Sequence, residues 1–366
     1  MFLMAVFWPR QARGRDGDPP GRSQTTAGSV EAMREREPGR GRGAEHPAQI
    51  PPRGWLDIVW RTVKEIGDDR LPAVAGGVTF YTLLAIFPGL GAFVSLYGLF
   101  ADVQQAQAQF VGLIGILPQE FLGIIGDQMM RLASAPAQNL GLAFVVTLIL
   151  AVWSASSGVK ALINGLNIAY DEEEKRGFLR VSLLALGATL SLLLFVALLA
   201  ALLVAAPALT PGEAPFAAVA RWLAALVLTT GLISLLYRFG PSRAAPRWQW
   251  VTWGSGTAAL LWMLGALGFS AYVANIGHYD RTYGPLGAVI AFMVWIWFSV
   301  LVILIGAELN AEIEHQTAVD STTGPPMPMG QRGAVMADTV GLRAQVGETV
   351  QAVTEKLQAI VRPKKR

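Results

Sequence analysis

The chain has 366 residues, of which 53% are hydrophobic and only 15% are charged, and its mean hydropathy is +0.43. Because soluble domains carry about 25% charged residues, the central part of this chain must be strongly apolar. Cysteine is absent, which excludes disulfides, thiol catalysis and Cys-ligated metal clusters.

After eight apolar residues, residues 9–54 are rich in Arg, Gly, Pro and acidic residues and contain few apolar ones. A segment of this composition has too little apolar surface to bury, so it is expected to lack a packed core. We therefore predict a disordered, basic cytoplasmic tail over residues 1–54.

A helix is predicted to begin at Trp55, because apolar residues recur from there at helical spacing. An amphipathic helix with Trp on its apolar face is suited to lie on a membrane surface, or to pack as a cap on a helix bundle. The two interpretations are compatible. The predicted apolar stripe is Trp55, Ile58, Val59, Thr62, Val63 and Ile66, with Asp57, Arg61, Lys64 and Glu65 off the stripe.

The central part of the chain contains uncharged runs long enough to cross a bilayer, which takes about 20 residues. We predict an all-α, polytopic membrane bundle of about six transmembrane helices within residues 55–315. Pro88 and Gly89 interrupt the first run and predict a kinked or broken helix. The spans are expected at residues 71–100, 139–162, 180–206, 217–238, 251–275 and 285–307.

Lys and Arg alternate in density from loop to loop, which predicts the orientation of the chain. The segments on one side carry 26 of the 29 basic residues, and those on the other side carry only Arg131, Arg221 and Arg281. This bias places both termini in the cytoplasm of a bacterial-type inner membrane. It also explains the basic charge balance without nucleic acid.

Two polar segments flank these spans. Residues 104–132 are interrupted by Pro118 and are predicted to form an interfacial or periplasmic helical segment. Residues 316–366 are predicted to be a cytoplasmic Pro/Gly/Thr linker, followed by a short amphipathic basic helix from Val346 to Ile360.

Uncharged polar residues run from the second span into the following loop, and a substrate site is one interpretation of them. Hydrogen bonding between helices and close packing of small residues is the favoured alternative. Lys160 is expected to lie at a span end, where its ammonium reaches the interface. The candidate substrate-binding residues are Tyr81, Ser157, Asn164, Asn167, Tyr170 and Tyr283.

A second polar cluster precedes the last span and is predicted to lie at its periplasmic mouth. It contains Asn275, His278, Asp280 and Arg281, followed by a candidate hinge at Gly284 and Pro285. An aromatic belt at the membrane interface is the alternative interpretation of this region.

Glu308 follows the last predicted span directly and is expected to pair with Lys160 or Arg238. No P-loop, zincin or serine-hydrolase motif is present, and three scattered histidines do not supply the clustered ligands of a metal centre. We predict no catalytic residues, no metal and no cofactor.

Three motifs resemble the YihY/virulence factor BrkB family over residues of about 55–315. One departure is Ala85, where the family often has Ser before the Phe-Pro pair. The motifs are Asp69 with Ala75-Gly76-Gly77-Val78-Thr79-Phe80-Tyr81 and Phe87-Pro88; Trp153-Ser154-Ala155-Ser156 with Asn167-Ile168-Ala169-Tyr170; and Tyr283-Gly284-Pro285-Leu286-Gly287-Ala288 with Gly306-Ala307-Glu308-Leu309-Asn310.

The resemblance implies a six-helix inner-membrane protein of poorly defined activity. Some family members were long labelled ribonuclease BN, and roles in envelope lipid transport have been suggested for others. Three hypotheses follow: transport or flipping of a lipid or amphipathic solute, a non-catalytic envelope scaffold, and, disfavoured by the lack of a metal cluster, a tRNA-processing ribonuclease. The expected partners are membrane lipids, with a second copy of the chain or an envelope protein as alternatives, and no nucleic acid.

Overall fold

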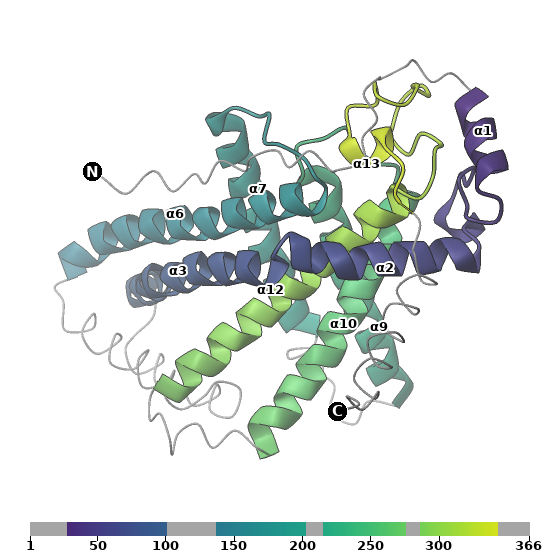
Figure 1. Ribbon diagram of the computed structural model, residues 1–366. Coiled ribbons are helices and arrows are strands. Elements are labelled where there is room, and N and C mark those ends of the chain that lie inside the picture. The colour runs from purple at the N-terminus through teal and green to yellow at the C-terminus, as the bar shows by residue number, and fades with distance from the viewer. Residues whose placement is uncertain (1–27, 101–136, 203–214, 276–285, 343–366) are drawn as a thin grey trace, which may run out of the picture.

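The computed structural model describes residues 28–100, 137–202, 215–275 and 286–342, and all of its secondary-structure elements there are helices. The long helices fan out from one region, which also holds α1 and α13 (Figure 1). The elements are α1 (Gly28–Arg36), η1 (Pro47–Gln49), α2 (Pro52–Asp68), α3 (Leu71–Phe100), α6 (Ala137–Ala169), α7 (Phe178–Ala200), α9 (Pro215–Phe239), α10 (Trp248–Asn275), α12 (Leu286–Glu314) and α13 (Val335–Asp338).

The described helices confirm a polytopic helical membrane protein. Five of them, α6, α7, α9, α10 and α12, contain windows long and apolar enough to cross a membrane. Helix α3 has 30 residues without a charge, and its described side chains cover the apolar stretch Leu71–Ala85. Its helical assignment continues through Pro88 and Gly89, so the helix is not broken there, and a kink at these residues stays a prediction.

Helix α12 is the centre of the packing. It contacts α2, α3, α6 and α10, while α3 packs along α6 and α10 packs along α9. Small residues allow these approaches: a Cβ on Gly165 would lie 3.0 Å from Leu304, and one on Gly158 would lie 3.2 Å from the Thr82 hydroxyl. Close approach at small residues is the usual way in which membrane helices associate.

Cross-helix hydrogen bonds support this packing. The Tyr237 hydroxyl donates to the carbonyl oxygen of Ile303 at 2.6 Å, which joins α9 to α12. The Trp297 indole donates to the carbonyl oxygen of Pro72 at 2.9 Å, which joins α12 to α3. Leu304 and Ala307 lie fully buried beside these bonds. Satisfied polar groups of this kind fix the rotation of a membrane helix.

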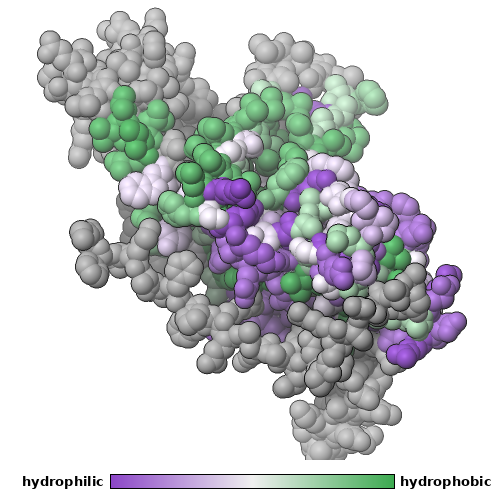
Figure 2. Space-filling model, turned by 90° about the horizontal axis from the view of Figure 1, so that it is seen from above, coloured by the Kyte–Doolittle hydropathy of each residue, from purple (hydrophilic) through white to green (hydrophobic). Residues whose placement is uncertain are grey.

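The ends of the bundle differ in polarity. The space-filling view shows a hydrophobic region next to a hydrophilic one (Figure 2). Large apolar side chains are exposed on α6, α7, α9 and α10, including Ile149, Leu194, Val227 and Leu264. A bilayer would cover such surface, which a soluble monomer rarely exposes over so wide an area.

Two segments predicted to be unstructured are packed in the fold. Residues 28–54 form α1, η1 and a loop that contacts residues 315–341, and the prediction of disorder is wrong for that part of residues 1–54. Arg42 explains the contact, because its guanidinium donates to the carbonyl oxygens of Gln316 at 3.1 Å and Gly341 at 2.7 Å. The predicted linker is likewise packed over residues 316–342, whereas the predicted helix from Val346 to Ile360 lies outside the described residues.

Helix α2 packs against α12, as the cap interpretation predicted. Its buried face differs from the predicted stripe: Asp57 and Arg61 are 1% and 4% exposed, whereas Val59 and Val63 are 51% and 65% exposed. The charged residues are buried because each finds an opposite charge, Arg40 for Asp57 and Glu312 for Arg61. The apolar residues of the opposite face are exposed, and an exposed apolar helix face is suited to contact a membrane surface.

Candidate functional site: a polar cap and a lateral groove

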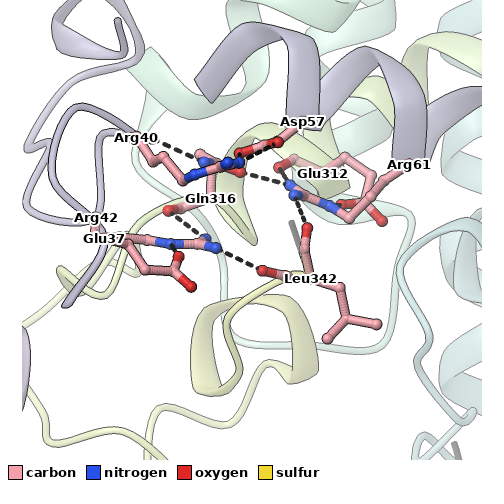
Figure 3. Close-up of polar contacts among 9 residues, drawn as sticks. Glu37, Arg40, Arg42, Asp57, Arg61, Glu312, Gln316 and Leu342 are labelled. Carbon is pink, nitrogen blue, oxygen red and sulfur yellow. Dashed lines mark hydrogen bonds and ion pairs between the residues drawn. The ribbon is translucent and has the colours of Figure 1, made fainter. Parts of the chain in front are cut away.

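The polar cap is the charged region formed by residues 37–69, 167–177, 240–247 and 308–342. Two of its arginines, Arg40 and Arg61, form ion pairs with buried carboxylates (Figure 3). Arg61 on α2 pairs with Glu312 on α12 and donates to the carbonyl oxygen of Leu342 at 2.9 Å. Arg40 pairs with Asp57 at 2.5 Å. The two contacts of Arg61 join segments more than 250 residues apart in sequence.

A second pair in the cap joins the α9–α10 loop to the end of α12. Arg243 donates to both carboxylate oxygens of Glu314, at 2.5 and 2.7 Å, and neither side chain is more than 2% exposed. Burial opposes the charge, but attraction to Glu314 dominates and raises the pKa of Arg243. The same guanidinium lies 5.0 Å from the ring centre of Tyr170, a cation–π arrangement. Burial raises the pKa of the Tyr170 hydroxyl, so this residue stays neutral.

Asn310 and Asn167 bind backbone inside the cap. Asn310 accepts from the Gly254 amide at 2.7 Å and donates to the Val251 carbonyl at 2.9 Å, so it holds α12 against the start of α10. Asn167 accepts from the Ser242 amide at 2.8 Å and donates to Glu174 at 3.1 Å. Each amide uses both its oxygen and its nitrogen to connect structural elements.

Glu308 differs from the other buried carboxylates of α12. It is 1% exposed, and its Oε2 atom has no hydrogen-bond partner among the described residues. The expected partners are engaged elsewhere: Lys160 lies 4.9 Å from the Phe178 ring centre, and Arg238 donates to the Pro246 carbonyl. The predicted pairing of Glu308 with Lys160 or Arg238 is therefore wrong.

The lateral groove lies on the apolar surface between α6 and α7 and has a volume of about 440 Å³. That volume falls within the range of ligand pockets, roughly 300–1,000 Å³. Apolar side chains form nearly all of its wall, and the few polar groups belong to Lys160 and two serines. The groove is lined by Leu148, Ile149, Trp153, Ser156, Lys160, Ser182 and Leu186.

Lys160 lies inside helix α6 rather than at its end, within the stretch Leu148–Ala169 that is long and apolar enough to cross a membrane. Helix α6 continues to Ala169, seven residues beyond the predicted end at residue 162, so Lys160 is nine residues, or about 13 Å, from the helix terminus. Lys160 forms no ion pair with a described residue. The Ser182 hydroxyl, also in the groove, is buried and has no hydrogen-bond partner in the part of the chain that the structure describes. An intramembrane cation with donors nearby is by default a candidate functional site.

The sequence-predicted substrate residues do not gather at this groove. Asn167 and Tyr170 are buried in the polar cap, whereas Tyr81 and Asn164 are exposed on α3 and α6. Ser157 donates to the Trp153 carbonyl within α6. Tyr283, His278, Asp280, Arg281, Gly284 and Pro285 lie outside the described residues, as does the side chain of Asn275.

The groove was missed because Lys160 was expected at a span end, where a lysine needs no explanation. The motif around Trp153 and Ser156 marked part of the groove in the sequence. Placing Lys160 inside the helix rather than at its end would have added a third groove residue on the same helix face. Among the described residues, no group of three or more His, Asp or Glu side chains is placed to hold a metal ion.

Comparison with known proteins places this architecture in a family. Residues 62–329 match the family described as Virulence factor BrkB. The chain belongs to the BrkB family. The match covers the lateral groove and only part of the polar cap: it begins in the middle of α2, after Arg61, and ends at residue 329 in the segment that follows α12.

Several relatives with assigned names are similar to this chain in sequence. A protein named UPF0761 membrane protein from Vibrio atlanticus is 28% identical over 255 residues, covering 68% of this chain and 79% of the relative. Another of that name from Chromobacterium violaceum is 27% identical over 253 residues, covering 67% of this chain and 59% of the relative. The Putative ribonuclease-like protein YfkH of Bacillus subtilis is 32% identical over 176 residues, covering 45% of this chain and 63% of the relative.

The matched stretches span about 60% of the Bacillus and Chromobacterium proteins. The names of the UPF0761 relatives identify them as membrane proteins and state no activity. No solved structure matches this chain.

Proposed function

We propose that this protein binds an anionic membrane phospholipid in the lateral groove and transports or flips it within the cell envelope. The observation that carries the proposal is an apolar groove between α6 and α7, with an ammonium that no acidic side chain of the described residues neutralises. Acyl chains match the apolar wall, and a phosphate matches Lys160.

The donors at the headgroup position support the same ligand class. The Ser182 hydroxyl is buried, neither accepts nor donates a hydrogen bond among the described residues, and lines the groove together with Lys160. A phosphate oxygen would accept from both groups, and a buried hydroxyl without a partner costs about 1–3 kcal/mol. Lys160 lies in the half of α6 nearer the polar cap, so with the cap in the cytoplasm the lipid enters from the cytoplasmic leaflet.

The experiment is lipid co-purification from a defined mixture. The protein is reconstituted in nanodiscs that contain phosphatidylglycerol and phosphatidylcholine in equal amounts, and the lipids retained after detergent extraction are identified by mass spectrometry. We expect phosphatidylglycerol to be enriched with the parent protein and with Arg180→Gln, and the enrichment to be lost with Lys160→Gln. Arg180 is the matched control, because it is an exposed cation in the first turn of α7 that does not line the groove.

Equal retention of both lipids by the parent, or equal loss in the two variants, would contradict the proposal. Movement of lipid is tested separately, by the rate at which labelled phosphatidylglycerol crosses proteoliposome membranes with the parent and with Lys160→Gln. A protein partner that co-purifies with lipids of bulk composition would favour the scaffold hypothesis instead.

A further inference from the structure

Three buried glutamates of α12 provide a comparison within one helix. Glu308, Glu312 and Glu314 are each at most 2% exposed. Glu312 pairs with Arg61, and Glu314 pairs with Arg243. Glu308 has no cationic partner among the described residues, and its Oε2 atom accepts no hydrogen bond from them.

The charged groups that face Glu308 are also acidic. They come from each element packed there: Glu312 from α12 itself, Glu65 and Asp69 from α2 and its end, and Asp171 from the turn after α6. Tyr170, a neutral hydroxyl, lies beside the same carboxyl. Arg61 and Arg243, the nearby buried arginines, are already paired with Glu312 and Glu314.

An ionised carboxylate in such surroundings is strongly disfavoured. It would lose its hydration without gaining a counter-charge, and like charges nearby would add repulsion. A metal ion would need several ligands, and no group of three suitable side chains among the described residues is placed to hold one. A proton needs only the one carboxyl oxygen.

We propose that Glu308 is a proton-binding site whose carboxyl is neutral when α12 is packed against α2 and the end of α6. The bond that forms is O–H on Glu308, and the proton comes from water on the polar-cap side. We assign the route to the half-buried carboxylates Glu65 and Asp69, because both are partly open to solvent and close enough to Glu308 to repel its charge. Release of the proton adds a negative charge to this junction and repels α12 from α2 and Asp171.

The experiment is infrared spectroscopy of the full chain in nanodiscs at neutral pH. A protonated buried carboxyl gives a carbonyl stretching band distinct from that of carboxylates. We expect this band in the parent, its loss in Glu308→Gln, and its retention in Glu174→Gln. Glu174 is the matched control, because its hydrogen bonds with Arg176 lower its pKa to about 2 and keep it ionised.

A second variant separates proton binding from folding. Glu308→Asp keeps a carboxyl on a shorter side chain, so it should shift the band rather than remove it. A parent spectrum without a band that depends on Glu308 would overturn the proposal. So would a band that disappears when NaCl replaces choline chloride, since a bound sodium ion would then occupy the site. Lipid enrichment by the groove is measured independently, so failure of one proposal leaves the other standing.

Discussion

The polar cap and the lateral groove differ in whether their cationic side chains are paired with carboxylates. In the cap, Arg61 and Arg243 are buried with a carboxylate within bonding distance. In the groove, Lys160 faces apolar side chains and an aromatic ring, with no carboxylate from the described residues. A protein that only needed stability would not maintain an unneutralised cation inside a membrane span. This difference is the basis of our proposal that the groove, unlike the cap, serves a ligand.

The largest expected effect comes from breaking a buried pair in the cap. Arg243→Ala leaves the Glu314 carboxylate buried without its guanidinium, which should lower the free energy of unfolding by about 3–5 kcal/mol. The measurement is thermal unfolding in nanodiscs followed by intrinsic fluorescence. Arg180→Ala removes an exposed cation and should leave the unfolding temperature unchanged. Equal stability of the two variants would show that the cap is not structural.

The next largest effect tests the helix contact beneath the cap. A Cβ on Gly254 would meet the Gly306 carbonyl and would lie 2.5 Å from the Asn310 side chain, so Gly254→Ala should force α10 and α12 apart. We expect a loss of about 1–3 kcal/mol in the free energy of unfolding. Gly256→Ala on the same helix is the control, because a Cβ there would meet no atom within 4 Å. Similar melting curves for both variants would contradict this packing.

The groove should respond in the reverse manner, with a large change in lipid binding and little change in stability. Trp153 is 65% exposed and lines the groove, so Trp153→Ala should reduce the amount of retained phosphatidylglycerol several-fold. The free energy of unfolding should change by less than about 0.5 kcal/mol. Trp222→Ala, at an exposed tryptophan on α9 outside the groove, should leave retention unchanged. Mass spectrometry of bound lipid and thermal unfolding of the same samples provide the two readouts.

The smallest effect concerns an exposed part of the cap and depends on pH. Partial burial opposes the charge of Glu174, but hydrogen bonds from Arg176 and Asn167 lower its pKa to about 2. The stabilisation is complete above the unfolded value of about 4.3 and is lost as the pH falls towards about 2. Glu174→Gln should therefore be less stable than the parent at pH 7, by less than about 1 kcal/mol, and the difference should shrink in acid. A difference that is constant from pH 7 to pH 3 would assign the effect to packing.

Hydropathy in the sequence predicted the helices well, but side-chain roles were predicted only in part. The predicted spans at residues 217–238 and 251–275 lie within three residues of α9 and α10. Helix α12, in contrast, extends seven residues past its predicted end at residue 307. Those residues include Glu312 and Glu314, whose charges are typical of a polar loop in the sequence. In the fold both are buried, because Arg61 pairs with Glu312 and Arg243 pairs with Glu314. The position of a cationic partner hundreds of residues away has no local signature.

The sequence by itself determined the membrane class and the helical architecture. Both follow from local properties, namely the length of apolar runs and the need of a backbone in lipid to satisfy its own hydrogen bonds. Only the tertiary structure decided that residues 28–54 and 315–342 pack together, that Lys160 lines a groove, and that Glu308 is buried among acids. These features depend on long-range pairing of charges, whose energy is set by burial and by which segments meet.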